Sequence, residues 1–191
     1  MKVLITILFF TFLNFTAQSQ DCTYSVSPSG VKVEWVAYKT PAKVGVKGSF
    51  TKLGFTEARE GKSLEGVMTG AQFNIDTKST STGDKGRDMK ISSFFFGRQK
   101  ISGEIVSVDA KKKLIQLEVN MNDQLQKIPL SYQIKKSKVL ATGYIDVLDF
   151  AMNDSLAKIT KACYAKHEGK TWSDVKIILE AKFKKSCKKK S

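Results

Sequence analysis

Beyond its first twenty residues, most of the chain alternates apolar and polar side chains, as β-strands with one buried face do. Residues 31–39 show this best, because Val33, Trp35 and Ala37 share one face. Strands with a single apolar face are typical of antiparallel sheets and not of parallel βαβ units, so the pattern predicts an antiparallel sheet. The other segments with this period are residues 44–50, 64–75, 114–121, 128–134, 139–150 and 175–183.

Two segments break the period and predict helices. Residues 153–168 place apolar side chains at helical spacing, and Gly169 ends the run. Residues 83–96 predict a shorter helix, with Asp84 as its N-cap and three consecutive phenylalanines at its end. Helices are therefore few and short beside the strands.

A sheet with so little helical cover must protect its edge strands from pairing with other chains. Closure into an up-and-down barrel removes the edges, and a barrel of about eight strands is packed solid or holds one small ligand. No repeat, linker or change of composition divides the chain. We therefore predict that residues 21–191 form one all-β domain. The expected fold is a closed antiparallel up-and-down β-barrel of about eight strands, lipocalin-like, with one or two short helices.

The N-terminal segment has the composition of a secretory signal peptide. Lys2 precedes an apolar run over residues 3–15, which is too short to span a bilayer, and Ala17 and Ser19 are small residues before a cleavage site. We expect residues 1–19 to be a signal peptide, cleaved after Ser19 or after the next residue. The alternative, a buried N-terminal helix, is disfavoured because the run is not amphipathic. We expect export to the periplasm or secretion.

The three cysteines suit an exported chain in which two form a disulfide and one remains free. In a closed barrel with an even number of strands, the first strand begins beside the end of the last, which favours a Cys22–Cys187 bridge. Cys163 is then a free thiol on the apolar face of its helix, and the rival pairing is Cys163–Cys187. A lipid anchor on Cys22 is a minor alternative, because Gln20 and Asp21 stand where such an anchor requires small residues.

The sequence carries a formal net charge of +14. Lysines concentrate at residues 111–113, at residues 135–136 and in the C-terminal tail, where they either attract an anionic membrane surface or form solvated turns. Nucleic acid is an unsuitable partner for an exported protein. With one histidine, His167, and no cysteine pair at metal-ligand spacing, the sequence offers neither a zinc site nor a Ser-His or Cys-His nucleophile. We expect no metal, no cofactor and no enzymatic activity.

The stretch from Ser63 to Phe96 runs from a strand ending in Ile-Asp, through a Ser/Thr-rich loop, to Arg-Asp and a closing Phe-Phe. This order resembles the signature of the YceI-like family, also described as polyisoprenoid-binding proteins. The hairpin with Trp35 and residues 48–50, and the passage through residues 149–150, fit the same family. The matching positions in the long stretch are Ile75, Asp76, Ser79, Thr82, Arg87, Asp88, Phe94 and Phe95.

The chain departs from the family at residues 120–130, which lack the His-Gly-Val-Thr-Lys turn that many members carry. The resemblance still implies an exported, lipocalin-like barrel that encloses an isoprenoid-type lipid, such as a polyprenyl chain or a quinone. It implies a non-enzymatic carrier or sequestering protein, in which each buried methylene contributes about 0.8 kcal/mol to binding. We expect the protein to be a monomer or a homodimer, and we expect this lipid to be its ligand.

The resemblance and the inward faces of the strands together imply a lipid tunnel, with Arg87 at its rim to meet a polar head. A competing interpretation is that the phenylalanines only plug the barrel and that Arg87 pairs with a local acid. A further alternative is a membrane-surface or stress-response envelope protein without a stoichiometric interior ligand, whereas an enzyme acting on a lipid lacks the necessary residues. The expected tunnel residues are Trp35, Phe50, Phe73, Ile75, Phe94, Phe95, Leu117, Val119, Met121, Ile145, Ile177 and Leu179.

Overall fold

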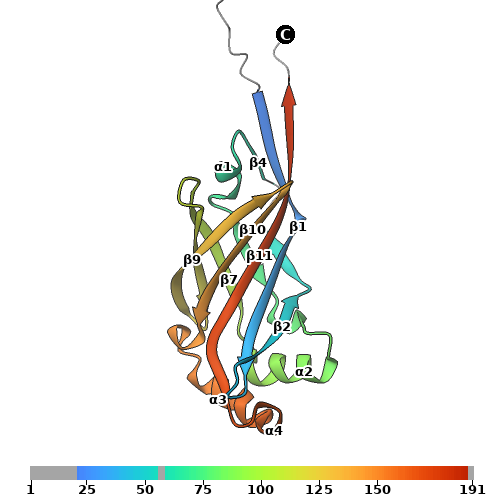
Figure 1. The fold of residues 1–191 in the computed structure, drawn as a ribbon, viewed down its shortest axis with the longest axis vertical. Coiled ribbons are helices and arrows are strands. Elements are labelled where there is room, and N and C mark those ends of the chain that lie inside the picture. Colours follow the sequence, from blue (N-terminus) through green and yellow to red (C-terminus); the bar gives the residue numbers. More distant parts are fainter. Residues whose placement is uncertain (1–20, 56–58, 189–191) are drawn as a thin grey trace, which may run out of the picture.

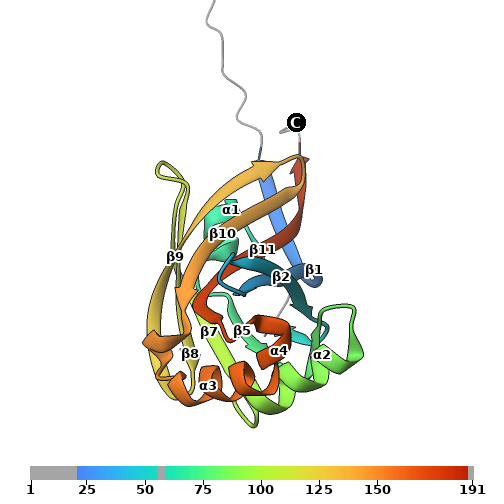
Figure 2. The same ribbon diagram turned by 60° about the horizontal axis from the view of Figure 1, so that its bottom comes forward.

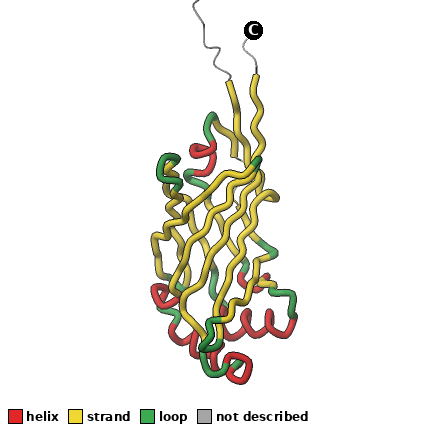
Figure 3. The backbone as a smooth tube through the Cα atoms, viewed as in Figure 1, coloured by secondary structure: helices red, strands yellow, loops and turns green. Residues whose placement is uncertain are grey.

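A computed structural model describes residues 21–55 and 59–188. The expected signal peptide, residues 1–19, lies outside the described residues. Within them, eleven strands form one sheet in which every pairing is antiparallel (Figures 1 and 3). The strands are β1 (Asp21–Lys39), β2 (Val44–Phe50), β3 (Leu53–Phe55), β4 (Arg59–Gly61), β5 (Gln72–Ile75), β6 (Thr80–Ser81), β7 (Ile101–Asp109), β8 (Leu114–Met121), β9 (Gln124–Lys135), β10 (Lys138–Asp146) and β11 (Thr171–Lys188).

The helical segments are short, and most of them gather at one end of the sheet (Figure 2). None of the helices in the described part of the chain is long and apolar enough to cross a membrane. The segments are α1 (Leu64–Met68), η1 (Thr77–Ser79), α2 (Lys85–Lys90), η2 (Ile91–Phe96), η3 (Val147–Phe150), α3 (Asn153–Ala162) and α4 (Tyr164–His167).

The all-β class and the antiparallel order are confirmed, but the sheet is curled into a half-barrel, so the prediction of a closed eight-stranded barrel is wrong. Its strand order is β3-β5-β7-β8-β9-β10-β11-β1-β2-β6, with β4 paired to β1. The ladder passes from the last two residues of β2 to the short strand β6, where it stops. There, Thr51 N donates to Ser79 O (3.0 Å) and Asp76 N donates to Lys52 O (3.2 Å). These bonds tie the bend to the turn around η1 instead of to another strand.

The first and last strands pair along most of their length and project together beyond the rest of the sheet (Figure 1). Cys22 and Cys187 are opposite each other in this ribbon and form a disulfide with an S–S distance of 2.10 Å. The predicted pairing is therefore confirmed, and Cys163 is a free thiol. Both bridged cysteines lie inside strands β1 and β11 rather than beyond their ends, because the ribbon is longer than the apolar alternation indicates.

Residues 64–75 do not form the single strand that their alternation predicts. Helix α1 occupies the first half, and the Ser63 hydroxyl caps it by accepting a hydrogen bond from Gly66 N (3.0 Å). Leu64, Val67 and Met68 are buried at helical spacing, which outweighs their partial two-residue period. Only residues Gln72–Ile75 belong to a strand.

Strand β7 is absent from the segments predicted as strands. A register shift between Ile105 and Ser107 interrupts its alternation, and Gly103 removes one side chain from its inward face. The alternation of apolar and polar residues in β7 is therefore too irregular to predict a strand, although β7 lies inside the sheet between β5 and β8.

The predicted helices are confirmed in outline. Asp84 caps α2 by accepting a hydrogen bond from Arg87 N (3.0 Å), and α2 continues directly into η2. Residues 153–168 form α3 and α4, which are separated at Cys163. Together α2, η2, α3 and α4 cover one end of the half-barrel (Figure 2).

Candidate functional site

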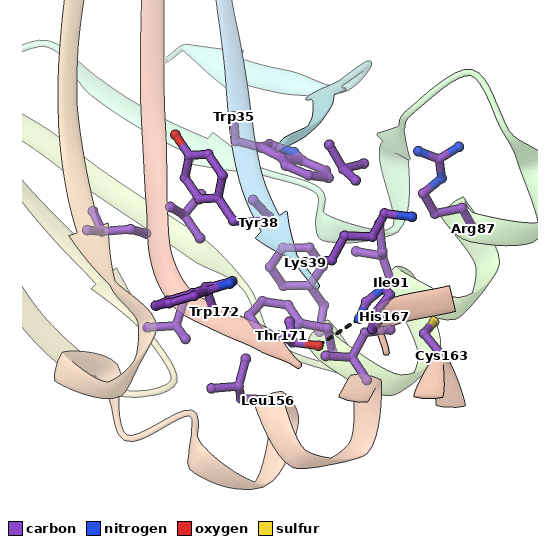
Figure 4. Close-up of a pocket in the computed structure, with 18 of the residues that line it drawn as sticks. Trp35, Tyr38, Lys39, Arg87, Ile91, Leu156, Cys163, His167, Thr171 and Trp172 are labelled. Carbon is purple, nitrogen blue, oxygen red and sulfur yellow. Dashed lines mark hydrogen bonds between the residues drawn. The ribbon is translucent and has the colours of Figure 1, made fainter. Parts of the chain in front are cut away.

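A cavity of about 150 Å³ lies between the inward face of the sheet and the helices that cover this end (Figure 4). Strands β1, β2, β7, β8, β10 and β11 form one side of it, and α2, η2, η3, α3 and α4 form the other. Its lining residues are mostly aliphatic and aromatic. The cavity therefore favours an apolar guest.

Trp35 of β1 is a large wall residue with only 7% of its surface exposed. Its indole lies over Gly48, its partner in the register with β2, where a side chain would overlap the ring. Trp35 Nε1 has no hydrogen-bond partner among the described residues. A buried donor without a partner costs about 1–3 kcal/mol, so an acceptor oxygen on a bound molecule would gain from this group.

The three consecutive phenylalanines lie on η2, a π-helical turn, and point in different directions. Phe95 and Phe96 line the cavity, with their ring centroids 5.0 Å apart, and Phe96 also packs 5.9 Å from Phe50. Phe94 is 46% exposed and lines a separate polar groove. Two of the three rings thus face the interior, at the end where the helices cover the sheet.

One face of helices α3 and α4 lines the cavity on the side away from the sheet. Leu156, Ile159, Cys163 and His167 are spaced by three, four and four residues, and all of them line it (Figure 4). This spacing keeps their side chains on one helical face although α3 ends and α4 begins between them. The Cys163 thiol is partly buried here.

The ionisable Lys, Arg and His side chains in the lining are Lys39, Arg87 and His167, and none of its described residues is Asp or Glu. His167 Nδ1 shares a hydrogen bond of 2.7 Å with the Thr171 hydroxyl (Figure 4). Burial lowers the pKa of His167 below its usual value, and the positive charges of Lys39 and Lys90 lower it further. The imidazole therefore favours its neutral form, and the positive potential in this region comes from lysine and arginine.

Arg87 also has an acidic neighbour outside the lining. Its Nη2 lies 3.5 Å from Asp84 Oδ2, and the Arg87 side chain is 41% exposed. Asp88 does not pair with it, because the Asp88 carboxylate accepts hydrogen bonds from Thr82 N and Thr82 Oγ1, at 2.7 and 2.6 Å. Arg87 thus lies at an edge of the cavity while it holds a weak, solvent-exposed ion pair.

A bound organic molecule would meet few polar groups in this cavity. The donors in the lining include Trp35 Nε1, the Lys39 ammonium and the Arg87 guanidinium. Within residues 21–55 and 59–188, no group of three or more His, Cys, Asp or Glu side chains could hold a metal ion.

The structure brings together half of the expected tunnel residues and separates the rest. Leu179 lines a second, smaller cavity, and Val119 packs against a buried core that contains Phe73, Ile75 and Leu117. These side chains fill the middle of the half-barrel, so the interior is not one open tunnel. The expected residues that line the larger cavity are Trp35, Phe50, Phe95, Met121, Ile145 and Ile177, together with Arg87.

The helical half of the lining was not predicted from the amino-acid pattern. The helical spacing of residues 156–167 indicated an apolar face, but not that this face would cover the cavity. Val175 shares the inward face of β11 with Ile177, so the alternation could have included it. Trp172 has the opposite parity and lies beyond the register shift between Ala37 and Lys39, so the alternation could not. The residues missed include Ile91, Phe96, Leu156, Ile159, Cys163, His167, Trp172 and Val175.

Solved structures share this fold at low sequence identity. A polyisoprenoid binding domain from Saccharophagus degradans, described as implicated in plant cell wall breakdown, is 15% identical with a TM-score of 0.55, covering 83% of this chain and 97% of that one. Burkholderia cenocepacia BcnA is 13% identical with a TM-score of 0.53, covering 83% and 99%. The Campylobacter jejuni YCEI protein is 12% identical with a TM-score of 0.51, covering 77% and 87%.

The amino-acid sequence also matches the model of a protein family. Comparison with curated proteins finds no matching sequence. The model of the YceI-like domain matches residues 24–183, which is most of the chain and includes the whole cavity lining. The chain therefore belongs to the YceI-like family.

Proposed function

We propose that this protein binds an isoprenoid-type lipid, a prenyl chain or a prenylated quinone, as a non-enzymatic carrier or sequestering protein. The observation that carries the proposal is the apolar cavity whose described lining residues include Lys39 and Arg87 but no acidic side chain. Apolar walls stabilise a hydrocarbon tail by about 0.8 kcal/mol per buried methylene. The description of the Saccharophagus degradans domain as polyisoprenoid binding supports the same class of ligand.

The cavity volume limits how much of the lipid it holds. A volume of about 150 Å³ equals that of an engineered protein cavity that admits benzene, and drug-sized ligands occupy about 300–1,000 Å³. The cavity therefore accepts one end of a prenyl chain. The rest of the tail requires space outside this cavity.

The polar head of the lipid belongs, in this proposal, beside the cationic edge of the cavity. Arg87 and Lys39 can donate to a carbonyl or phosphate oxygen there. Trp35 Nε1, which has no partner among the described residues, can donate to an oxygen of the same lipid. Quinone carbonyls and phosphate oxygens are both acceptors of this kind.

We place this activity outside the cytoplasm, in the periplasm or after secretion. The Cys22–Cys187 disulfide supports that location, because disulfides persist in oxidising compartments and are rare in the cytosol. Cell fractionation with a C-terminal tag tests it, and recovery of the full-length, uncleaved chain in the cytosol would contradict it.

Two variants on adjacent positions of β11 test lipid binding. Ile177 lines the cavity, whereas Ile178 lies between inward positions and is opposite Glu34 on the other face of the sheet. Ile177→Asp should abolish binding of farnesol, since a carboxylate in the cavity loses its hydration without a partner. Ile178→Asp should bind as the unmodified protein does.

The readouts are native mass spectrometry and a titration with farnesol, alongside circular dichroism to show that both variants are folded. Stoichiometric binding that disappears only in Ile177→Asp supports the proposal. A folded Ile177→Asp protein that binds farnesol normally, or no binding of any prenyl lipid by the unmodified protein, would exclude it.

A second candidate function is attachment to an anionic membrane surface. The lysines of residues 111–113, of residues 135–136 and of residues 182–188 all lie at the end of the sheet opposite α2, α3 and α4, in the β7–β8 turn, the β9–β10 turn and the end of β11. Such a cluster attracts anionic headgroups, and the attraction is screened over about 10 Å at 0.1 M salt. Binding to anionic vesicles should therefore weaken as salt rises, and binding that is absent or insensitive to salt would exclude this candidate.

A further inference from the structure

A second cavity of about 40 Å³ lies inside the half-barrel at the end away from α2, α3 and α4. Val31, Ile105 and Leu179 are among its mainly apolar lining residues. Among its described lining residues the charged side chain is Arg59, whose guanidinium donates to the carbonyls of Gly70 and Thr69, at 2.8 Å each. The described part of this lining is thus mainly apolar, and its charged group is paired with the backbone.

Strand register places the two cavities one behind the other along the sheet. On β7, Ile101 lines the larger cavity and Ile105 the smaller, and Gly103 between them lines neither. Strand β1 repeats this order, with Trp35 at the larger cavity and Val31 at the smaller. Residues four apart on a strand are separated by about 13 Å, so a single layer of side chains divides the cavities.

Phe73 and Phe55 are the aromatic side chains of that layer. Phe73 is opposite Gly103 in the register of β5 and β7, and its ring covers Gly103 so closely that an added Cβ there would lie 2.6 Å from Phe73 Cζ. Phe73 is 7% exposed. On its other side it is opposite Phe55 of β3, whose ring centroid lies 6.4 Å away and which lines the smaller cavity. Val33 and Val119, at the same level, are smaller.

We propose that Phe73 sets the length of the lipid tail that this protein accepts, and that the smaller cavity is the place for the distal end of a longer tail. The inference rests on the proposed function. With Phe73 in place, a tail that enters the larger cavity stops at this ring. Without the ring, the two cavities join into one apolar channel. This channel runs over Gly103, which has no side chain to block it.

The test is the dependence of affinity on chain length for prenyl alcohols of ten, fifteen and twenty carbons. In the unmodified protein, affinity should stop rising once the tail reaches Phe73. In Phe73→Ala it should continue to rise, and the twenty-carbon alcohol should bind at least about tenfold tighter than it binds the unmodified protein, because an extra isoprene unit is buried. Phe73→Leu, which keeps more of the core filled, provides a second variant if Phe73→Ala does not fold.

Two further variants separate the role of the ring from a general loosening of the core. Val67→Ala enlarges the smaller cavity from helix α1, outside the row of Phe55, Phe73 and Gly103, so it should keep the chain-length limit of the unmodified protein. Ala71→Val narrows the smaller cavity, and added to Phe73→Ala it should remove most of the gain for the longest alcohol.

The outcomes distinguish this inference from the proposed function. If the unmodified protein binds the short alcohols but the folded Phe73 variants show the same limit, the inference is wrong and the proposed function stands. If Val67→Ala extends the limit as much as Phe73→Ala, the ring is not the barrier and the inference is also wrong. If no prenyl alcohol binds the unmodified protein, the proposed function fails first.

Discussion

The six-membered ring of Trp35 covers Gly48, the residue opposite it on the neighbouring strand. This contact between two adjacent strands builds one wall of the larger cavity, because the indole can lie against β2 only where β2 has no side chain. A Cβ at Gly48 would overlap three atoms of the ring.

Gly48→Ala should therefore lower the free energy of unfolding by about 1–3 kcal/mol, the usual effect of overpacking, and should weaken farnesol binding because the indole is displaced towards the cavity. Urea unfolding and a binding titration measure the two effects. Gly54→Ala on β3 is the matched control, since its Cβ would lie 3.7 Å from the nearest atom and cause no clash. Equal stabilities of the two variants would show that the ring is free to move.

Arg87→Met should weaken binding of farnesyl phosphate about tenfold and leave farnesol nearly unchanged, because a guanidinium–phosphate contact contributes on the order of 1.5 kcal/mol. The control is Arg98→Met, since Arg98 lines the polar groove and not the larger cavity. Both ligands are titrated by calorimetry against each variant. Equal losses of affinity for farnesol and farnesyl phosphate would show that Arg87 packs against the tail and does not contact the polar head.

The lowered pKa of His167 predicts a stability that depends on pH. The folded protein keeps the imidazole neutral where the unfolded chain protonates it, so its contribution is complete above the unfolded pKa of about 6.5 and is lost as pH falls through the lower folded pKa. His167 is the only histidine, so one NMR titration reports its pKa directly. Between pH 7.5 and pH 5, the free energy of unfolding of His167→Gln should change less than that of the unmodified protein. A measured pKa of His167 above 6.5 would contradict the prediction.

Removing the disulfide by Cys22→Ser and Cys187→Ser should lower the free energy of unfolding by about 5 kcal/mol in the chain-entropy model, because the bridge joins residues 165 positions apart. Denaturant unfolding measures the change. Cys163→Ser removes the remaining thiol without opening the loop and should cost much less. A bridged protein no more stable than the double variant would show that β1 and β11 hold the ends together unaided.

Most of the fold was predictable because its causes are local. The alternation in residues 44–50 and 114–121 coincides with strands β2 and β8, and Asp84 caps α2 as its residue type indicates. Failures occurred where two local signals compete, as at α1, where Leu64, Val67 and Met68 fit a helix better than the expected strand. The disulfide was also predicted, because it needs only that the first and last strands be neighbours.

The candidate site divides in the same way. The inward positions of Trp35, Phe50 and Ile177 follow from the two-residue period of their strands. That period cannot show which inward positions border empty space, and Phe73 and Leu117 share the inward pattern but are buried as core.

The all-β class, the inward faces of most strands, the family and the basic charge follow from the amino-acid sequence, since these depend on periodicity, composition and short motifs. The tertiary structure was needed to show that the sheet stays open at β3 and β6, that the helices enclose the cavity lined by Trp35, and that the interior holds two separate cavities. These features arise from contacts between residues distant in the chain, such as Phe50 with Phe96 and Thr51 with Ser79. Packing at such contacts depends on side-chain volumes meeting in three dimensions, which no local pattern encodes.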